Sequence, residues 1–436
     1  MNSAVPKSQT FITWLLLIPV IAWFYIGFFL TMSLWYPAGV TPAQWQSHLM
    51  HFTIIYALWL VVFFSYRLFD VDALRVTQSF VGKFLAAILV CLFIGALYFY
   101  FQPELLLTPR RFLIVHVLIT GLGIMLWYIL MRRAVQRSLG HAVYAHSSLN
   151  NHEELQTLLQ RYKFLGLEYA GVSAGCESNT FSKGTILILP NRHDIADAGA
   201  RELFELRNLG VHFVEYPELY ETLTRAIHLS ALTDMWFLHS VDYSKHVFFD
   251  SLKKIFDIFS GLVVGLIFVA TYPFIALLIK ASSSGPILFR QLRTGQLGQD
   301  FTLYKYRTMT IDSSSDTWAH SGQTVTWIGR FLRATRLDEL PQTINILKGD
   351  MSVVGPRPEQ VHIVEQMRQQ IPYYDERLIV KPGLSGWAQL HVYASSVEET
   401  KRKLQYDLYY IKHRSLLFDA EIILKTVYNI ITLSGR

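Results

Sequence analysis

Two adjacent carboxylates in the last third of the chain are the residues best placed to do chemistry. Asp338 and Glu339 are followed by Pro341, a residue that suits the first turn of a helix. Apolar residues at helical spacing follow at Leu340, Ile344 and Leu347. Gly349 is placed to end this helix. We therefore expect the pair at a helix N-terminus, where backbone N–H groups favour anions.

Adjacent carboxylates can take different tasks because neighbouring residues do not share a helix face. One can attack a phosphorus atom while the other holds a divalent metal ion. Taken alone, the pair favours a simpler interpretation, in which Asp338 and Glu339 only stabilise the start of the helix.

Cations that could neutralise an anionic substrate lie in the same region of the chain. Lys305 and Arg307 alternate with aromatic residues on a predicted strand, which places both on one face. Arg333 precedes the carboxylates, and Arg357 lies between two prolines that restrict its backbone. A rigidly held guanidinium suits bidentate contact with a phosphate. The alternatives are a solvated edge strand for the first pair and a surface turn for Arg357.

The elements that must position these residues begin with a membrane-like front end. Of the 436 residues, 17% are charged, against about 25% in a typical soluble protein. Residues 1–131 carry only nine of these charges. Four apolar runs approach the roughly 20 residues that cross a bilayer, at about 11–36, 50–66, 84–101 and 112–131. This pattern excludes a wholly soluble enzyme and a wholly membrane-embedded transporter.

Basic residues beside the four runs predict that both ends of this front end face the cytoplasm. The segments then placed inside carry seven Lys and Arg residues, and those placed outside carry two, Arg110 and Arg111. A fifth apolar run, at about 255–279, has basic residues at both ends and contains Pro273, which favours a kink. We expect a re-entrant helix that enters the bilayer, bends at the proline break Tyr272–Pro273 and returns to the same face. A true crossing is the alternative.

Residues 138–248 predict a small Rossmann-like α/β domain, because strand-like and helical patterns alternate. Strands are expected at 141–146, 168–174, 185–190 and 211–216, and helices at 152–163, 194–208 and 217–227. The turn after the first strand contains no glycine, which disfavours a dinucleotide site. A spacer, oligomerisation or regulatory role is expected instead.

The chain has a net charge of +6, and residues 251–436 alone have an equal surplus of positive over negative side chains. Such a surplus suits an anionic bilayer surface or a phosphate-rich ligand. The two cysteines are too few for a disulfide framework.

Five motifs in residues 250–436 resemble, in order and spacing, the bacterial sugar transferase family, the monotopic phosphoglycosyl transferases. They are Gly-Pro-x-x-Phe-Arg-Gln at 285–291, Lys-Tyr-Arg-Thr-Met at 305–309, Leu-Asp-Glu-Leu-Pro-Gln at 337–342, Gly-Pro-Arg-Pro at 355–358 and Lys-Pro-Gly-x-x-Gly at 381–386. The rest of the chain resembles the family's long form, which includes undecaprenyl-phosphate glucose and galactose phosphotransferases. Two features depart from it. Many relatives have Asn-Gly-Arg where this chain has His391-Val392-Tyr393, and many long relatives have a Gly-rich turn in the middle domain.

The resemblance implies transfer of a sugar-1-phosphate from a UDP-sugar to polyprenyl (undecaprenyl) phosphate, with release of UMP. This reaction initiates assembly of a glycan such as an exopolysaccharide, a capsule or the O-antigen of lipopolysaccharide. The implied catalytic residues are Asp338, which forms a covalent phosphosugar intermediate, and Glu339, which binds Mg²⁺. The implied phosphate-binding residues are Lys305, Arg333 and Arg357, assisted by Arg307.

We therefore expect a membrane α+β protein. Four transmembrane helices occupy 1–137, the Rossmann-like domain without a Gly-rich loop occupies 138–248, and a mainly helical catalytic domain with the re-entrant helix occupies 249–436. The resemblance implies the bacterial inner membrane, with the catalytic domain on the cytoplasmic face. The expected partners are the UDP-sugar, polyprenyl phosphate and the bilayer, with a homodimer possible and no nucleic acid. The alternative is a non-enzymatic membrane scaffold or sensor that binds phosphorylated lipid.

Overall fold

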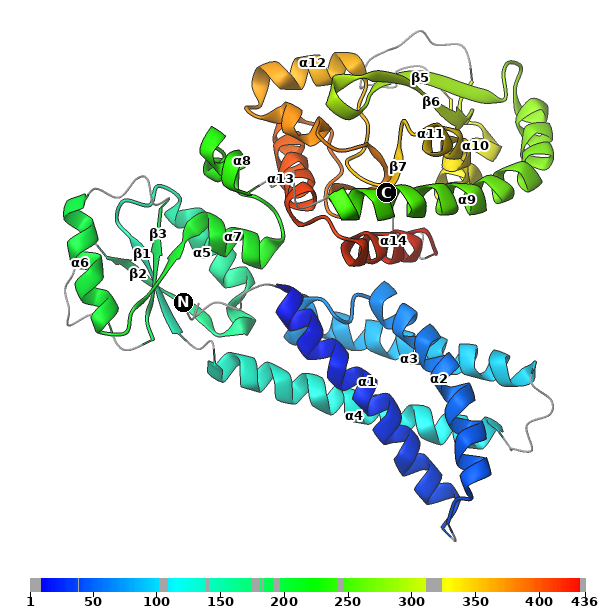
Figure 1. Ribbon diagram of the computed structural model, residues 1–436, viewed down its shortest axis with the longest axis horizontal. Helices are drawn as coiled ribbons and strands as arrows, with labels where there is room; N and C mark the ends of the chain where they lie inside the picture. Colours follow the sequence, from blue (N-terminus) through cyan, green and yellow to red (C-terminus); the bar gives the residue numbers. More distant parts are fainter. Residues whose placement is uncertain are drawn as a thin grey trace. The chain divides into compact units, whose positions relative to one another are not determined.

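The computed structural model of the protein describes residues 9–37, 39–101, 109–138, 141–173, 181, 184–190, 197–240, 247–310 and 324–431. Within it the chain divides into two compact units, Met1–Arg225 and Ala226–Arg436 (Figure 1). The division lies before the boundary at 248 that the sequence predicted, so the segment 226–240 belongs with the second unit.

Four long helices form the first part of unit one. They are α1 (Gln9–Trp35), α2 (Pro42–Ser65), α3 (Gln78–Tyr100) and α4 (Pro109–Ser138), with the 3-10 turn η1 (Val71–Arg75) between α2 and α3. Each overlaps one of the four predicted apolar runs. Helices α2 and α3 begin earlier than those runs because the side chains of Thr41 and Thr77 cap their N-termini.

These helices bury aromatic rings and expose apolar side chains. In the interior, the rings of Phe24 and Tyr56 stack at 5.0 Å, and His116 Nε2 lies 2.9 Å from Tyr56 Oη. The exposed outer positions include Leu89, Phe93, Leu118 and Leu122. Such a surface suits lipid rather than water. Among the described residues, five helices are long and apolar enough to cross a membrane, namely α1 to α4 and α9 (Val247–Ser282).

The second part of unit one contains a four-stranded sheet in the order β2-β1-β3-β4, with every pair parallel. The strands are β1 (His141–His146), β2 (Leu167–Ser173), β3 (Ile186–Leu189) and β4 (His212–Glu215). The helices are α5 (His152–Arg161), α6 (Asp197–Asn208) and α7 (Tyr216–Thr224). The strands and helices lie close to their predicted positions, with β2 and β3 following one another in the described residues.

Alternate residues of the buried strand β3 pack into different hydrophobic clusters. Ile186 and Ile188 lie in one cluster with leucines of α5 and α7, whereas Leu187 and Leu189 lie in another with Leu206 of α6. The strand period of two therefore places α5 and α7 on one face of the sheet and α6 on the other.

Basic residues connect the helical bundle to this sheet domain. Arg75 of η1 lies over the Phe164 ring at 5.2 Å and donates to the Arg161 carbonyl oxygen at 3.2 Å. Arg132 of α4 donates to the Arg75 carbonyl oxygen at 3.2 Å. The bundle and the sheet domain thus form one unit.

The second unit is mainly helical, as predicted. Its helices are α8 (Asp234–Ser240), α9, α10 (Trp327–Ala334), α11 (Thr343–Lys348), α12 (Val361–Gln370), α13 (Val397–His413) and α14 (Leu416–Ile431). Two short sheets accompany them: β5 (Leu288–Thr294) with β6 (Asp300–Tyr306), antiparallel, and β7 (Ser352–Val354) with β8 (Gly383–Ser385), parallel. The 3-10 helices η7 (Leu337–Gln342) and η8 (Tyr374–Leu378) carry residues of the candidate site.

Helix α9 packs against the second unit along its length. In its first half, the Asp257 carboxylate accepts a hydrogen bond from Ser352 Oγ at 2.9 Å, and Thr343 Oγ1 donates to the Gly261 carbonyl oxygen at 2.7 Å. In its second half, Ile279 is fully buried in a cluster with residues of α10. Both halves of α9 therefore contact the same globular unit.

The face of α9 away from these contacts is apolar and exposed, at Ile255, Phe259, Leu262, Leu266, Val269, Phe274 and Leu277. The helix continues through Pro273, and Figure 1 shows its ribbon turning near the carboxyl end. The expected proline site at Tyr272–Pro273 thus lies inside one continuous helix. The helix persists because Tyr272 and Ile275, on either side of the proline, pack into the same hydrophobic cluster.

Candidate active site

The carboxylate pair lies in the 3-10 helix η7, between α10 and α11. Arg336 adopts a left-handed backbone, with φ 58°, that turns the chain from α10 into η7. Asp338 and Glu339 therefore lie in the first turn of η7 and precede α11, so the pair is at a helix N-terminus as expected, although the first turns are 3-10 rather than α-helical. Pro341 lacks the N–H that an α-helical turn through the pair would need. Gly349, with φ 88°, ends α11 as expected.

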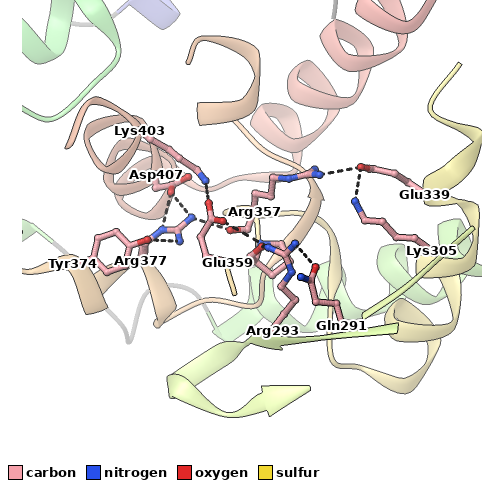
Figure 2. Close-up of polar contacts among 11 residues, drawn as sticks. Gln291, Arg293, Lys305, Glu339, Arg357, Glu359, Tyr374, Arg377, Lys403 and Asp407 are labelled. Carbon is pink, nitrogen blue, oxygen red and sulfur yellow. Dashed lines mark hydrogen bonds and ion pairs between the residues drawn. The ribbon is translucent and has the colours of Figure 1, made fainter. Parts of the chain in front are cut away.

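Glu339 is held by two cations that meet at one of its oxygen atoms. Oε1 lies 3.2 Å from Lys305 Nζ and 3.1 Å from Arg357 Nη2 (Figure 2). Burial on its own would raise the pKa of this carboxyl, but Lys305 and Arg357 outweigh burial and hold the pKa well below its usual range. Glu339 is therefore an anion at any working pH, and three of the predicted site residues come together here.

Asp338 has the opposite electrostatic character. It is buried, and no hydrogen-bond partner of its Oδ1 is found among the described residues. Burial and the neighbouring Glu339 raise the pKa of Asp338, against the opposing effect of Lys305, Arg333 and Arg336. The result is a carboxyl group with one uncommitted oxygen near three cations, an arrangement that suits a nucleophile.

The other two predicted cations lie differently. Arg333, on α10, acts on the charge of Asp338 and donates from Nε to Thr308 Oγ1 at 2.9 Å. Arg307 instead donates to the carbonyl oxygens of Ser283 and Ser284, both at 2.7 Å, directly after α9. Its guanidinium is therefore used to hold the end of α9 and does not join Lys305 at Glu339.

Backbone hydrogen bonds fix the turn that precedes Arg357. The Gly355 N–H donates to the Ser385 carbonyl oxygen at 2.9 Å, and the Gly383 N–H donates to the Pro356 carbonyl oxygen at 2.8 Å. A Cβ on Gly355 would lie 2.3 Å from a backbone oxygen of the facing loop, so only glycine fits there. The Gly-Pro-Arg-Pro and Lys-Pro-Gly motifs are thus two halves of one structure that presents Arg357.

A second group of charges lies beside this turn, and the sequence analysis did not find it. Arg377 pairs with Asp407 at 2.8 Å, with side chains 2% and 1% exposed, and Lys403 pairs with Glu359 (Figure 2). The available signal was in α13, where Lys403 and Asp407 share a buried face with Leu404. Charged residues at the apolar positions of a helix indicate buried ion pairs.

Glu359 gives a prediction about acid stability. Burial alone would raise its pKa, but Lys403 and Arg377 outweigh burial and hold the pKa at about 2, below the ordinary 4.5. Because the folded pKa lies below the unfolded one, the ionised carboxylate stabilises the fold fully above pH 4.5, and this contribution is lost as the pH falls toward 2. At pH 7 we expect Glu359→Gln to lower the unfolding free energy by an amount on the order of 3 kcal/mol.

Thermal unfolding of the solubilised protein at several pH values measures this effect. The wild-type midpoint should fall more steeply with acid than that of Glu359→Gln. Glu398→Gln is the matched control, because Glu398 pairs with Lys401 while 79% exposed. Equal midpoints for the wild type and Glu359→Gln at pH 7 would contradict the prediction.

The carboxylates suit only one way of binding a magnesium ion, in which the substrate supplies part of the coordination. The described residues contain no group of three or more His, Cys, Asp or Glu side chains that could hold a metal, so a cage made by protein ligands does not fit. Mg²⁺ is commonly held by one or two carboxylates together with substrate phosphates. Glu339 fits that arrangement, since both of its cation contacts involve Oε1.

Comparison with known proteins identifies relatives of this region. Residues 248–433 match the family described as bacterial sugar transferase. A UDP-N-acetylgalactosamine-undecaprenyl-phosphate N-acetylgalactosaminephosphotransferase of Aeromonas hydrophila is 39% identical over 241 residues, 54% of this chain and 56% of the relative. A UDP-glucose:undecaprenyl-phosphate glucose-1-phosphate transferase of Escherichia coli (strain K12) is 40% identical over 183 residues, 41% of this chain and 39% of the relative. The exopolysaccharide production protein PSS of Rhizobium leguminosarum bv. phaseoli is 36% identical over 191 residues, 42% of this chain and 96% of the relative.

The chain spans about half of the Aeromonas relative and 39% of the Escherichia relative, but nearly all of the Rhizobium one. The matched residues 248–433 contain α9, the carboxylate pair and the turn that carries Arg357. Because a relative 36% identical is matched over 96% of its length, this chain belongs to the bacterial sugar transferase family.

Proposed function

We propose that this protein transfers a sugar-1-phosphate from a UDP-sugar to polyprenyl phosphate and releases UMP. The observation that carries the proposal is the buried Asp338, whose Oδ1 has no partner among the described residues, in the field of Lys305, Arg333 and Arg336. Such a carboxylate is available to attack phosphorus, and the cations oppose its repulsion of an anionic substrate. The names of the Aeromonas and Escherichia relatives support this reaction.

In the first step, an oxygen of the Asp338 carboxylate attacks the phosphorus that bears the sugar. The bond from that phosphorus to the bridging oxygen breaks, and UMP leaves with the bonding electrons. In the second step, a polyprenyl phosphate oxygen attacks the same phosphorus, and Asp338 leaves as a carboxylate. One phosphoanhydride is replaced by another, so the exchange needs little driving force. Phosphoryl transfer of this kind depends chiefly on positioning and charge neutralisation.

The residues around Asp338 supply that positioning and charge. Glu339 orients Lys305 and Arg357 through Oε1. The Arg357 side chain is 32% exposed, and a guanidinium has five N–H donors, so Arg357 can contact a donor phosphate as well as Glu339. Mg²⁺, when bound by Glu339 and the diphosphate, neutralises negative charge on the phosphates.

The lipid acceptor requires the site to lie at a membrane surface, and α9 supplies the contact. One face of α9 packs on the catalytic unit along the helix, while the other is apolar and exposed. We place α9 in the bilayer as a re-entrant helix with both ends in the cytoplasm, where UDP-sugars are found. Helices α1 to α4 cross the inner membrane. The sheet domain from β1 to α7, Rossmann-like in its predicted pattern, serves as a spacer or regulatory domain.

Cysteine labelling tests this topology. Ser251→Cys and Ser284→Cys place thiols near the two ends of α9, at exposed positions. We expect a membrane-impermeant maleimide to label both only after inside-out vesicles are made or the membrane is opened. Residues 37 and 39–41, between α1 and α2, provide the control site on the opposite face. Labelling of the two α9 positions from opposite faces would refute the re-entrant arrangement.

A lipid-linked first sugar is the substrate on which a glycan is extended, so we place the reaction at the first step of glycan assembly. The Rhizobium relative's name supports an exopolysaccharide, with a capsule or O-antigen as other products of the same chemistry. The test is to incubate the purified chain with Mg²⁺, undecaprenyl phosphate and a panel of UDP-sugars that includes UDP-glucose and UDP-N-acetylgalactosamine. UMP should form with at least one donor. UMP with none would leave the non-enzymatic scaffold as the better description.

A further inference from the structure

The turn that carries Arg357 is held by side chains as well as by the backbone. Arg377 donates from Nη2 to the carbonyl oxygen of Arg357 at 2.9 Å. Arg293 donates from Nη1 to the carbonyl oxygen of Pro358 at 3.0 Å. Together with the bond from the Gly383 N–H to the Pro356 carbonyl oxygen, this gives three successive carbonyls a donor each. The backbone of Arg357 is therefore constrained on both sides.

Arg377 is itself fixed on three sides. Its Nε lies 2.9 Å and its Nη2 2.8 Å from Asp407 Oδ2, and its Nη1 donates to the Tyr374 hydroxyl at 3.3 Å. Figure 2 shows this group joined through Arg357 to Glu339 and Lys305. A planar guanidinium has donors in fixed directions, so it can reach a carboxylate, a hydroxyl and a carbonyl together. A lysine ammonium has no such fixed fork.

A contribution to stability is, by itself, a weak explanation for the presence of the buried Arg377–Asp407 pair. Both side chains are nearly inaccessible to solvent, and the loss of hydration on burying two charges offsets much of their attraction. Replacing a buried pair by apolar residues of similar size is often neutral or stabilising. What apolar residues could not supply is the hydrogen bond to the Arg357 carbonyl.

We propose that Arg377 is a positioning residue, which holds the backbone of Arg357 so that its guanidinium reaches Glu339 and the donor phosphates. The part that concerns phosphates rests on the proposed function. Arg377 acts only through Arg357 and touches no substrate. For the rate of the reaction, its removal therefore matters only while Arg357 is present.

A double-mutant cycle tests this statement. We expect Arg377→Met/Asp407→Leu, which replaces the pair by apolar residues, to lower the rate of UMP release by the folded protein on the order of 10²-fold. In an Arg357→Ala background the same replacement should cause no further loss. Arg377→Lys, which keeps the charge, should fold and retain part of the activity, and it replaces the double variant in the cycle if that variant does not fold. Independent, additive losses would overturn the proposal.

The matched control is the Arg368–Asp375 pair, which has a similar distance of 2.7 Å but side chains 49% and 48% exposed. Arg368→Met/Asp375→Leu should leave the rate unchanged. Hydrogen exchange provides a readout that does not depend on activity. Amides of Gly355 and Gly383 should exchange faster in the Arg377 variants than in the wild type or the control. Unchanged exchange would overturn the proposal, whereas faster exchange with a wild type that forms no UMP would count against the proposed function alone.

Discussion

Asp338→Asn is expected to lower turnover by roughly 10³-fold or more, because an amide is a poor nucleophile and nothing else in the site replaces it. It should also abolish the covalent phosphosugar adduct that the proposed mechanism predicts for the wild type when the lipid acceptor is left out. The fold should not suffer. Burial and Glu339 raise the pKa of Asp338, which means that its negative charge is disfavoured in the folded protein, so the thermal midpoint should be equal to or above that of the wild type.

Intact-protein mass spectrometry and a UMP assay measure these two results. Asp375→Asn is the control, since this carboxylate is 48% exposed and pairs only at the surface with Arg368. If Asp338→Asn kept its adduct or its turnover, Asp338 would lose the role of nucleophile.

Glu339→Gln is expected to combine a large loss of activity, on the order of 10²-fold, with a loss of stability. The cause is that Lys305 and Arg357 both pair with the negative charge of Glu339. Glu339 Oε1 contacts Lys305 and Arg357, whose side chains are 18% and 32% exposed. A neutral amide removes the negative charge that both cations contact at Oε1, and it removes the carboxylate proposed to bind Mg²⁺. The low pKa of Glu339 means that its ionised form stabilises the fold at pH 7, so the unfolding free energy should fall by about 2 kcal/mol.

The two adjacent carboxylates therefore make a matched pair of experiments. Removing the charge at 338 should leave stability equal or higher, whereas removing it at 339 should lower stability. Thermal unfolding without Mg²⁺ or substrate compares them directly. The same direction of change in both variants would contradict the electrostatic description of the site.

The sequence predicted the parts of this site that depend on motifs. Asp338, Glu339, Lys305 and Arg357 were identified because each lies in one of five ordered motifs, and three of them meet at one oxygen atom. Arg307 lies in the same motif as Lys305 but holds the end of α9. Alternation along a strand places two residues on one face, but it cannot say which partner each side chain finds when the strand ends between them.

The buried network of Arg377 and Asp407 could not be predicted in the same way. The two residues are 30 apart in the chain, and their pairing depends on how η8 packs against α13. The same limit applies to α9, where proline chemistry predicted a bend at Pro273 but not the contacts that hold the helix around it. Packing of Tyr272 and Ile275 on both sides kept the helix continuous. Local sequence patterns predicted the strands and helices. The Arg377–Asp407 pairing and the course of α9 depend on contacts between distant elements, which such patterns do not contain.

Identification of the nucleotide product tests the central claim most directly. The purified full chain is incubated with undecaprenyl phosphate, Mg²⁺ and the donor that the panel selects, and the nucleotides are separated and quantified against the lipid product. Transfer of a sugar-1-phosphate predicts UMP in equal amount to a polyprenyl diphosphate sugar. UDP with a polyprenyl monophosphate sugar would mean that the sugar alone is transferred and would contradict attack by Asp338 on phosphorus.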